Sequence, residues 1–311
     1  MRPNATSPPA TLLRPLSTAS RPESGDTPCV RLALPKGRIQ DGVLGLLAEA
    51  GVRVHTGARG YRPSLSIPGF ETKLLKPQNL VEMLAAGSRD LGFAGADWVA
   101  EKDLDLVELV DTGLDPVRLV AAAPMALLED GELPARPLRV ASEYERITRS
   151  WMAARPTPGS FVRTYGATEV FPPEDADVIV DNTATGATLA ANGLRIVAEL
   201  MRSSTRLYAS PAALEDPVKR PAIDDLVLCL RAVLEARGRA MVELNVAAVD
   251  LGAVVDALPC MREPTVASLY GQTGFAVRAA VPRDALPRLV PALKARGATD
   301  LVVSRCEQIV P

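Results

Sequence analysis

Short apolar segments alternate with amphipathic helical segments over most of the first two thirds of the chain. Residues 30–34, 138–141 and 177–180 have the length and apolar content of buried strands, and a turn and a helical pattern follow each of them. Further strands are expected at 90–95, 106–110 and 119–123. Strands that alternate with helices in this way indicate an α/β unit with a largely parallel sheet, and the pattern continues to about residue 200.

The last third of the chain carries a second, smaller pattern. Strand-like and helical segments follow one another at 226–234, 240–246, 251–258, 274–281, 286–295 and 301–304. This order is close to β-α-β-β-α-β, the arrangement of ferredoxin-like domains. The proline-containing segment 210–225 before it is interpreted as a linker. We therefore expect one α/β unit over residues 28–225 and a small ferredoxin-like domain over residues 226–311.

The first 27 residues differ from both units. They are rich in Pro, Ser, Thr and Arg, and no acidic residue precedes Glu23. Such a segment buries too little apolar surface to offset its ordering entropy, so residues 1–27 are interpreted as a disordered tail. An organelle transit peptide has a similar composition and is the alternative. The apolar core of a secretory signal is absent.

Charge and composition exclude several classes of function. Lys and Arg number 35 and Asp and Glu 37, so the formal net charge is -2 and bulk charge would not attract a polyanion. Aromatic residues make up 4% of the chain, too few for the stacking platforms that bind single-stranded nucleic acid. The longest uncharged apolar run, 119–128, contains Pro124 and is shorter than the ~20 residues of a membrane span. Neither nucleic acid nor a membrane is an expected partner.

Reactive side chains are few and scattered. The four cysteines stand far apart without a C-x-x-C motif, which indicates reduced thiols of a cytoplasmic protein. The single histidine, His55, stands near no partner motif, so neither a Ser-His-Asp triad nor a histidine metal site is expected. Catalysis would then depend on positioning and electrostatics, and no catalytic residue is assigned.

The segment that begins at Asp177, D-V-I-V-D-N-T-A-T-G-A-T-L, carries the strongest chemical signal. An apolar strand leads there into a loop of small hydroxyl residues and glycine that opens a helix. Amides at such a helix start, with the hydroxyls of Thr185 and Thr188, suit a phosphate, and Gly186 allows a close approach. Asp177 and Asp181 would share one face of the strand and could accept hydrogen bonds from ribose hydroxyls or help to hold hydrated Mg²⁺. An ordinary strand–turn–helix with Thr185 as N-cap is the alternative.

Two cations follow the first strand in the turn P-K-G-R. Lys36 and Arg38, on either side of Gly37 at the carboxyl end of a strand, suit an anionic group such as pyrophosphate, although such a turn is also common as a solvated connector. Charged or polar residues beside other apolar strands are further candidates, with solvent exposure as the alternative for each: Arg118, Glu143, Tyr144 and Arg149.

Together these segments resemble the long form of ATP phosphoribosyltransferase, the family that opens histidine biosynthesis. The resemblance covers residues 30–311, and its motifs occur in the family's order. They are R-L-A-L-P-K-G-R at 31–38, D-L-G-F-A-G-A-D-W at 90–98, R-L-V at 118–120, A-S-E-Y at 141–144, D-V-I-V-D-N-T-A-T-G-A-T-L-A-A-N-G-L at 177–194, E-P-T-V at 263–266 and G-A-T-D-L-V-V at 297–303. The resemblance implies a two-lobed catalytic unit like that of periplasmic binding proteins and an ACT-like, ferredoxin-like regulatory domain.

The resemblance also implies a reaction and its site residues. The phosphoribosyl group of phosphoribosyl pyrophosphate would move to N1 of ATP, with Mg²⁺ as cofactor, release of pyrophosphate and feedback inhibition by histidine. Phosphoribosyl pyrophosphate would contact Asp177, Asp181, Thr185, Gly186, Ala187 and Thr188. ATP or its phosphates would contact Lys36, Gly37, Arg38, Arg118, Glu143, Tyr144 and Arg149. Histidine would bind near Asn245, Thr265, Ala280 and Asp300. The family further implies a homo-hexamer or a dimer, and the metal ligands stay unassigned.

Some positions depart from the family's pattern. The residues D-P-V at 115–117 stand where members often carry a glycine–cysteine turn, and N-T-A at 182–184 is less apolar and less acidic than usual. The motif T-G-A-T at 185–188 is intact. A phosphoribosyltransferase with another acceptor base is therefore one alternative. A ligand-binding sensor without catalysis is the other, because the expected two-lobed architecture also occurs in solute-binding proteins, although the two intact phosphate motifs weigh against it.

Overall fold

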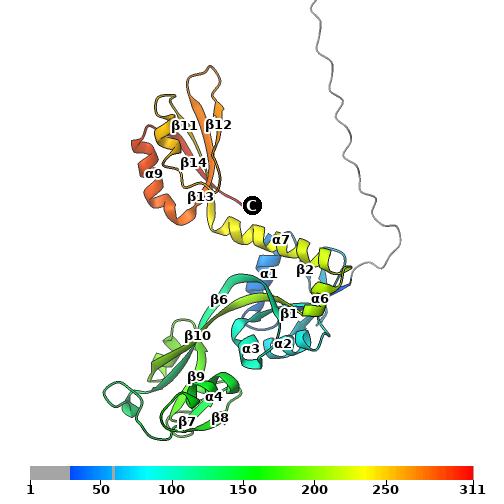
Figure 1. Ribbon diagram of the computed structural model, residues 1–311, viewed down its shortest axis with the longest axis vertical. Coiled ribbons are helices and arrows are strands. Elements are labelled where there is room, and N and C mark those ends of the chain that lie inside the picture. Colours follow the sequence, from blue (N-terminus) through cyan, green and yellow to red (C-terminus); the bar gives the residue numbers. More distant parts are fainter. Residues whose placement is uncertain (1–28, 58–59, 311) are drawn as a thin grey trace, which may run out of the picture.

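The computed structural model describes residues 29–57 and 60–310, so the tail predicted over residues 1–27 lies outside the described residues. They form a two-lobed α/β unit and a separate C-terminal domain, which stands beyond one end of the long helix α7 (Arg220–Arg237) (Figure 1). The predicted combination of a two-lobed α/β unit and a ferredoxin-like domain is confirmed. Within 29–57 and 60–310, the structure contains no helix that combines the length and the apolar character required to cross a membrane.

One eight-stranded sheet runs through both lobes in the order β4-β1-β5-β10-β6-β9-β7-β8. Its strands are β1 (Val30–Pro35), β4 (Phe70–Leu75), β5 (Leu91–Gly95), β6 (Val107–Pro124), β7 (Arg139–Ser142), β8 (Ser160–Arg163), β9 (Val178–Thr183) and β10 (Leu194–Ala209). The first lobe contains β4, β1 and β5, the second contains β9, β7 and β8, and the long pair β6 and β10 passes through both (Figure 1). A small hairpin of β2 (Val54–His55) and β3 (Ser64–Leu65) accompanies the first lobe, and His55 is exposed there.

The large sheet is mixed, whereas the sequence predicts a largely parallel one. Parallel pairing joins β1 to β4 and β5, and β7 to β8 and β9. The long strands β6 and β10 are antiparallel to their neighbours. The strands predicted separately at 106–110 and 119–123 lie at the two ends of β6. Register shifts at several bulges between β6 and β10 let this pair bend from one lobe into the other.

Helices cover both lobes. The first lobe carries α1 (Gln40–Glu49), α2 (Pro77–Ala85), α3 (Ala96–Lys102), α6 (Pro211–Glu215) and α7, and the second carries α4 (Glu145–Ala153) and α5 (Ala187–Ala191). Short 3₁₀ turns lie at Met125–Leu127, Thr168–Val170 and Arg283–Ala285. In α2, Pro77 opens the helix, where its missing amide hydrogen costs nothing, and Leu80, Val81 and Leu84 form the buried face.

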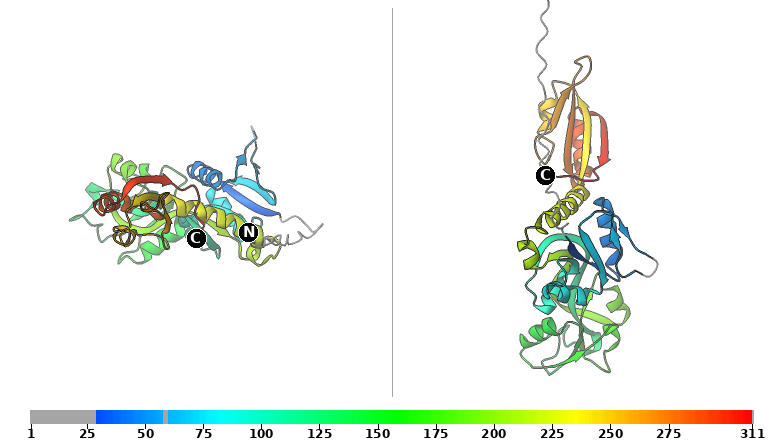
Figure 2. Two further views of the ribbon diagram at one scale, coloured as in Figure 1. Left: turned by 90° about the horizontal axis from the view of Figure 1, so that it is seen from above. Right: turned by 90° about the vertical axis from the view of Figure 1, so that its right-hand side faces the viewer.

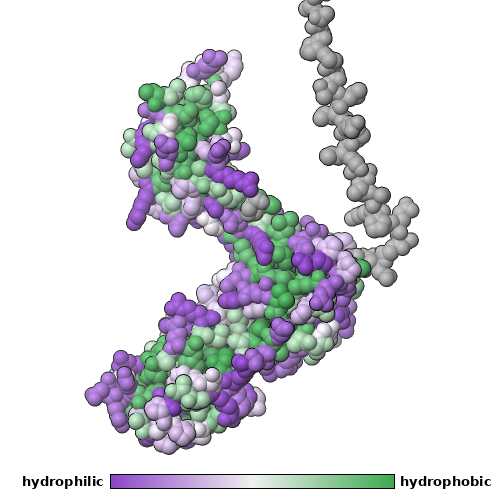
Figure 3. Space-filling model, in the orientation of Figure 1, coloured by the Kyte–Doolittle hydropathy of each residue, from purple (hydrophilic) through white to green (hydrophobic). Residues whose placement is uncertain are grey.

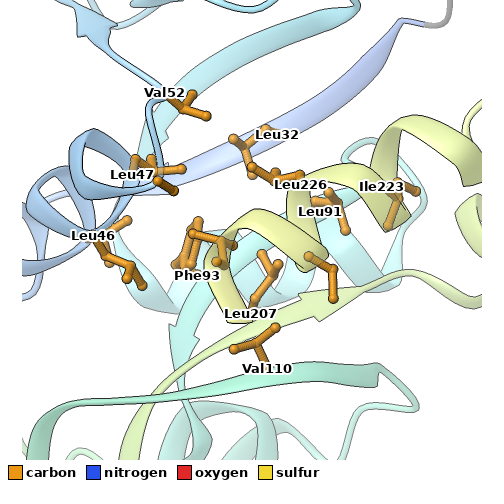
Figure 4. Close-up of a cluster of buried hydrophobic side chains, with 14 of the residues drawn as sticks. Leu32, Leu46, Leu47, Val52, Leu91, Phe93, Val110, Leu207, Ile223 and Leu226 are labelled. Atoms are coloured by element: carbon orange, nitrogen blue, oxygen red, sulfur yellow. The ribbon is translucent and has the colours of Figure 1, made fainter. Parts of the chain in front are cut away.

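The largest hydrophobic core lies in the first lobe, between the sheet and the helices α1 and α7. Leu32, Phe93 and Leu207 contribute from the sheet, Leu46 from α1 and Leu226 from α7 (Figure 4). These side chains are at most 2% exposed. The core therefore joins segments from the beginning, the middle and the later part of the α/β unit.

The domain boundary predicted at residue 226 falls inside α7 and is corrected by the structure. Ile223, Leu226, Leu230 and Val233 are buried in the core of the first lobe, because their three- and four-residue spacing places them on one face of the helix. The segment 210–225 is not a linker, since it contains α6 and the first turns of α7. The C-terminal domain begins after α7, at β11.

The C-terminal domain has the predicted ferredoxin-like order, but the predicted segment 226–234 belongs to α7, and the sheet is completed by a strand at 265–268 that the sequence does not predict. Its elements are β11 (Arg239–Val246), α8 (Leu251–Val255), β12 (Thr265–Ser268), β13 (Phe275–Pro282), α9 (Leu286–Ala295) and β14 (Thr299–Arg305). The antiparallel sheet has the order β12-β13-β11-β14, and Figure 2 shows it above α7 in a second view. In β11, Val242 and Leu244 pack against the helices, whereas Glu243 and Asn245 alternate onto the open face. Hydrophobic residues gather at the centre of this domain in Figure 3.

The end of the chain returns from the C-terminal domain to the first lobe. The Ile309 amide donates to the Ala232 carbonyl of α7 at 2.9 Å. Gln308 Nε2 donates to the Glu49 carbonyl at the end of α1 at 3.2 Å. Arg237 of α7 forms an ion pair with the Glu49 carboxylate at 2.9 Å. The first two contacts attach the end of the chain to both helices, and the ion pair joins α1 to the end of α7.

Candidate active site

A cavity lies between the two lobes, where β6 and β10 pass from one lobe to the other. Its walls come from the turn after β1, the start of α2, the junction of β5 and α3, the central parts of β6 and β10, and the end of β9. The residues are Lys36, Arg38, Ile39, Pro77, Gly95, Asp97, Trp98, Asp115, Val117, Asn182, Ser203, Ser204 and Thr205. We call this space the interlobe cavity.

Lys36 and Arg38 line the interlobe cavity from the first lobe, as the sequence predicts for an anion site. β1 ends at Pro35, and Gly37 has a φ of 89°, a left-handed conformation that glycine adopts without strain and that turns the chain toward α1. The Lys36 ammonium nitrogen lies 4.2 Å from the centre of the Tyr61 ring. Two positive charges are therefore presented at one edge of the cavity.

Asp181 lies on the second lobe, next to the cavity residue Asn182. Burial raises the pKa of Asp181 to about 6, and the negative charges of Glu143 and Glu169 also raise it. A hydrogen bond from the Asn182 amide at 2.7 Å and the positive charge of Arg38 act in the opposite direction. The carboxyl group therefore changes charge near pH 6, and the positive charge of Arg38 in the opposite lobe acts on it.

The loop between β9 and α5 has the features of the predicted phosphate site. β9 continues to Thr183, whose Oγ1 accepts a hydrogen bond from the Gly186 amide at 2.9 Å, and Thr185 Oγ1 accepts one from the Ala187 amide at 3.3 Å. Gly186 has a φ of 85° and is the N-cap of α5, so this position favours glycine. Thr185, Ala187 and Thr188 are exposed, so a ligand can reach the loop.

Asp177 lies at the other end of β9, and the structure does not bring it into the site. It is four positions from Asp181 along the chain, which is ~13 Å in extended backbone. Its Oδ2 accepts a hydrogen bond from the Arg139 amide at 2.7 Å, and the guanidinium groups of Arg136 and Arg139 lie 3.4 Å and 3.5 Å from its carboxylate. Burial raises the pKa of Asp177, but these hydrogen bonds and charges outweigh burial and hold the pKa below its usual value. The predicted pair of Asp177 and Asp181 in one ligand site is therefore not formed.

Tyr144 is close to the interlobe cavity, but it is a buried residue rather than part of an open wall. Its hydroxyl donates to Asp97 Oδ2 at 2.6 Å, and its ring stacks on Trp98 with the centroids 4.8 Å apart. Burial and the neighbouring Asp97 charge raise the pKa of Tyr144, so the phenol stays protonated. Glu143, the preceding residue, is half-buried and close enough to Asp181 to raise its pKa.

Arg118 and Arg149, predicted from the sequence for the same cleft, do not line the cavity. Arg118 of β6 forms an ion pair with Glu199 of β10 at 3.4 Å. Arg149 is exposed on α4, where it pairs with Glu145 at 2.8 Å and lies 4.9 Å from the centre of the Phe161 ring. Both arginines are held by neighbours within their own part of the fold.

Four polar or aromatic residues of this region are not singled out by the sequence: Asp97, Trp98, Asn182 and Ser203. Asp97 and Trp98 belong to the motif at 90–98, but nothing local distinguishes their side chains from those of any strand–helix junction. Ser203 lies in β10, where arginine and glutamate residues interrupt the apolar pattern that would have predicted a strand. Only the pairing of distant segments identifies them.

A second cavity lies on the C-terminal sheet and contains three of the four residues predicted for histidine. Asn245, Thr265 and Asp300 line it, while Ala280 does not. Asn245 Nδ2 and Thr299 Oγ1 donate to Asp300 Oδ2 at 3.0 Å and 3.1 Å, and these hydrogen bonds lower the pKa of Asp300. Ala280 lies farther along β13, and its carbonyl accepts a hydrogen bond from the Met261 amide at 3.2 Å. We call this space the C-terminal cavity.

Family comparisons agree with the two-part architecture. The family model described as ATP phosphoribosyltransferase (HisG) matches residues 76–232, and the model for the HisG C-terminal domain matches residues 236–308. The limit between the two matches falls at the end of α7, where the structure places the domain boundary.

Individual relatives give the same result. The ATP phosphoribosyltransferase of Chlorobaculum parvum is 34% identical over 274 residues, which covers 86% of this chain and 93% of the relative. That of Desulforudis audaxviator is 34% identical over 291 residues, covering 91% and 99%. A solved ATP phosphoribosyl transferase (HisG:HisZ) complex from Thermotoga maritima is 25% identical, with a TM-score of 0.59 over 66% of this chain and 98% of that chain. The chain belongs to the ATP phosphoribosyltransferase family, in the long form that carries a C-terminal domain.

Proposed function

We propose that this protein transfers the phosphoribosyl group of phosphoribosyl pyrophosphate to N1 of ATP, releases pyrophosphate, and thereby performs the first step of histidine biosynthesis. Family membership supports the reaction class. The observation that carries the proposal for this chain is the interlobe cavity, where Lys36 and Arg38 of one lobe and Asn182 of the other line one space, and the strand of Asn182 leads directly into the β9–α5 loop. An anionic substrate held between the lobes would contact both.

The charges around the cavity suit displacement of pyrophosphate from C1 of a ribose. The transition state places positive charge on the sugar and negative charge on the leaving group, and fixed cations such as Lys36 and Arg38 stabilise the latter. Asp181 lies on the sugar side in this proposal, where its carboxylate would accept hydrogen bonds from ribose hydroxyls. The exposed β9–α5 loop, with Thr185 and Thr188, would hold the 5-phosphate. The adenine N1 is neutral and needs orientation more than activation, so no residue is assigned as general base.

Magnesium fits this site as a companion of the substrate. The residues that the structure describes include no group of three or more His, Cys, Asp or Glu side chains placed to hold a metal. Mg²⁺ commonly binds through one or two carboxylates together with substrate phosphates. Asp181, whose pKa of about 6 leaves it largely ionised above neutral pH, would supply such a carboxylate. When bound, the ion would neutralise charge on the leaving pyrophosphate.

We further propose that histidine binds in the C-terminal cavity and inhibits the reaction. Asp300 keeps its carboxylate ionised through hydrogen bonds from Asn245 and Thr299, so it would attract the α-ammonium group of an amino acid. Thr265 lines the same space, whereas Ala280 lies outside it and is not part of the proposed site.

One assay tests both proposals. Pyrophosphate release from phosphoribosyl pyrophosphate, ATP and Mg²⁺ is measured with and without histidine. ATP-dependent release that histidine suppresses is the expected result. Release that histidine does not affect would contradict the inhibitor proposal alone. Folded protein that binds histidine but releases no pyrophosphate would contradict the transferase reaction and favour a sensor without catalysis.

The proposed assembly is a homo-hexamer or a dimer, as the family implies. Sedimentation equilibrium over a range of protein concentrations should give a mass of two or six chains. A single-chain mass at every concentration would contradict this proposal.

A further inference from the structure

A chain of four side chains crosses from the first lobe to the second at the wall of the interlobe cavity. Ser203 of β10 donates from Oγ to Asp97 Oδ1 at 2.6 Å, and the Tyr144 hydroxyl donates to Asp97 Oδ2 at 2.6 Å. Asn182 Nδ2 in turn donates to the Tyr144 oxygen at 2.8 Å. Asp97 lies in the first turn of α3 in the first lobe, whereas Tyr144 and Asn182 belong to the second. The chain therefore joins both lobes to the strand that links them.

Asp97 is buried at 5% exposure, and its environment is built to hold the carboxylate. Besides the two hydroxyls that donate to it, its own amide donates to Ser203 Oγ at 3.1 Å. A Cβ at Gly95 would lie 2.2 Å from Asp97 Oδ1, so the carboxylate occupies space that only glycine leaves free. A buried carboxylate is costly unless its hydrogen bonds are satisfied, and here both oxygens have donors.

Two more residues of α3 also contact the second lobe. Trp98 stacks on the Tyr144 ring, and the Glu101 carboxylate accepts hydrogen bonds from the Arg146 and Ile147 amides at 3.0 Å and 3.1 Å. Those amides belong to the first turn of α4. One face of α3 therefore sets the orientation of α4 against the first lobe.

The last member of the chain connects this contact to the proposed substrate site. Asn182 lies between Asp181 and Thr183, whose Oγ1 holds the Gly186 amide of the β9–α5 loop. An amide side chain fixed by Tyr144 therefore fixes the backbone from which the loop departs. Lys36 and Arg38 are attached to the first lobe, so the distance between them and the loop depends on the same interlobe contact.

We propose that Asp97 is a positioning residue, which through Tyr144 and Asn182 holds the β9–α5 loop at the correct distance from Lys36 and Arg38. This inference rests on the proposed function, because it assigns a consequence for turnover to that arrangement. A misplacement of about 1 Å between reacting groups can cost ~100-fold in rate. Tyr144 is buried and does not line the interlobe cavity, so the effect of removing its hydroxyl would come from geometry.

The primary test is Tyr144→Phe, which removes the hydroxyl and keeps the ring that stacks on Trp98. Tyr208→Phe is the matched control, because Tyr208 is also a buried tyrosine and lies within the core of the first lobe. Tyr144→Phe should lower kcat/KM for phosphoribosyl pyrophosphate at least tenfold, through both a higher KM and a lower kcat. Tyr208→Phe should leave both constants nearly unchanged. Tyr144→Phe should melt at a lower temperature than Tyr208→Phe, because Asp97 Oδ2 loses a donor, so both variants are assayed well below their melting temperatures. Equal kinetics in the two variants would overturn the proposal.

A double-mutant cycle with Asp97→Asn tests whether the residues act as one unit. If Asp97 acts through Tyr144, the double variant should lose little more activity than either single variant, whereas independent roles would give multiplied losses. Amide hydrogen exchange gives a readout that needs no turnover. Residues 182–188 should exchange faster in Tyr144→Phe than in Tyr208→Phe, and unchanged exchange there would contradict the positioning role. If the wild type releases no pyrophosphate, the proposed reaction fails, but the exchange comparison still decides whether this chain holds the loop.

Discussion

The interlobe cavity and the C-terminal cavity hold their polar groups in different ways. In the interlobe cavity, Asp97 is buried, and its two partners are Tyr144 of the second lobe and Ser203 of β10, which passes through both lobes. In the C-terminal cavity, Asn245, Thr299 and Asp300 lie on adjacent strands of one small sheet, and Thr299 and Asp300 are exposed. The first arrangement requires the whole α/β unit to be folded, whereas the second depends on one domain. Substitutions in the two cavities should therefore differ in the size of their effects and in how much of the molecule they affect.

The largest expected effect comes from shortening the chain at two points, one just after α7 and one within it. A chain that ends at Gly238 keeps the helix and should fold, release pyrophosphate and show no response to histidine. A chain that ends at Asp225 loses Leu226, Leu230 and Val233 from the core. Each such loss costs ~2–5 kcal/mol, and together the losses are as large as the ~5–15 kcal/mol that stabilises most folded domains. The shorter chain should not fold.

Circular dichroism and thermal melting distinguish these outcomes before any assay of activity. A cooperative transition in the chain that ends at Gly238, and none in the other, is expected. Equal stability of both chains would contradict the assignment of α7 to the first lobe and would return the boundary to residue 226. Inhibition by histidine in the folded, shortened chain would contradict the separation of the two sites.

A comparison of the strands shows which parts of the fold the sequence can predict. The strands β1, β7 and β13 are predicted within a residue or two, because a buried strand leaves a short apolar or alternating pattern in contiguous residues. β10 has Arg195, Glu199, Arg202 and Arg206 among its 16 residues and gives no such pattern. Its insertion between β5 and β6 makes the sheet mixed, and a pairing between distant strands is not visible in either strand alone.

The candidate site also divides into contiguous motifs, which the sequence predicts, and contacts between distant segments, which it does not. Lys36–Gly37–Arg38 and the β9–α5 loop are each contiguous, so their residue types and spacing predict an anion site, and both are found at or beside the interlobe cavity. Asp97 lies 47 residues from Tyr144 and 106 from Ser203, so no local pattern joins them. Asp177 is predicted for the site although it lies outside it. Its shared face with Asp181 is visible in the sequence, but the ion pairs of its carboxylate with Arg136 and Arg139 are not.

The second prediction compares the two acidic residues of the β9 segment. The pKa of Asp181 is raised to about 6 in the fold, so its ionised form is destabilising above pH 6. Asp181→Asn should therefore increase the free energy of unfolding at pH 8, by at most ~3 kcal/mol, the equivalent of the pKa difference from an ordinary aspartate. It should also raise KM for phosphoribosyl pyrophosphate, because the proposed contact with ribose hydroxyls is altered.

The dependence on pH has a defined sign for each residue. A raised pKa gives Asp181 a stabilising effect that is complete below pH ~4 and is lost as the pH rises through 6, so the gain of Asp181→Asn should disappear in acid. Asp177 has a lowered pKa, and its stabilising effect is present at neutral pH and is lost on acidification. Asp177→Asn should therefore destabilise the protein at pH 8. Urea unfolding at pH 4 and pH 8 measures both, and the same sign for the two variants at pH 8 would contradict this account.

The third prediction concerns the C-terminal cavity. Asp300→Ala should weaken inhibition by histidine roughly tenfold or more, because a charge-assisted hydrogen bond to a ligand is lost. Uninhibited turnover should stay within twofold of the wild type, since the residue lies in the separate domain. Ala280→Ser is the matched control outside the cavity, and histidine should inhibit this variant as strongly as it inhibits the wild type. Dose–response curves for the two variants measure the difference, and equal weakening by both would place the histidine site elsewhere on this domain.

The smallest expected effect is beside the attachment of the C-terminal domain, where Glu49 of α1 pairs with Arg237 at the end of α7 on the protein surface. Glu49→Gln should lower the free energy of unfolding by only ~0.2–1 kcal/mol, because exposed ion pairs gain little over solvation. The backbone contact from Gln308 to the Glu49 carbonyl is retained in this variant. Asp224→Asn, which breaks the exposed Arg220–Asp224 pair within α7, should have a similar effect on stability. If Glu49→Gln also weakened inhibition by histidine while Asp224→Asn did not, the attachment would transmit the signal between the two regions. Unchanged inhibition in both variants would leave it as a structural contact alone.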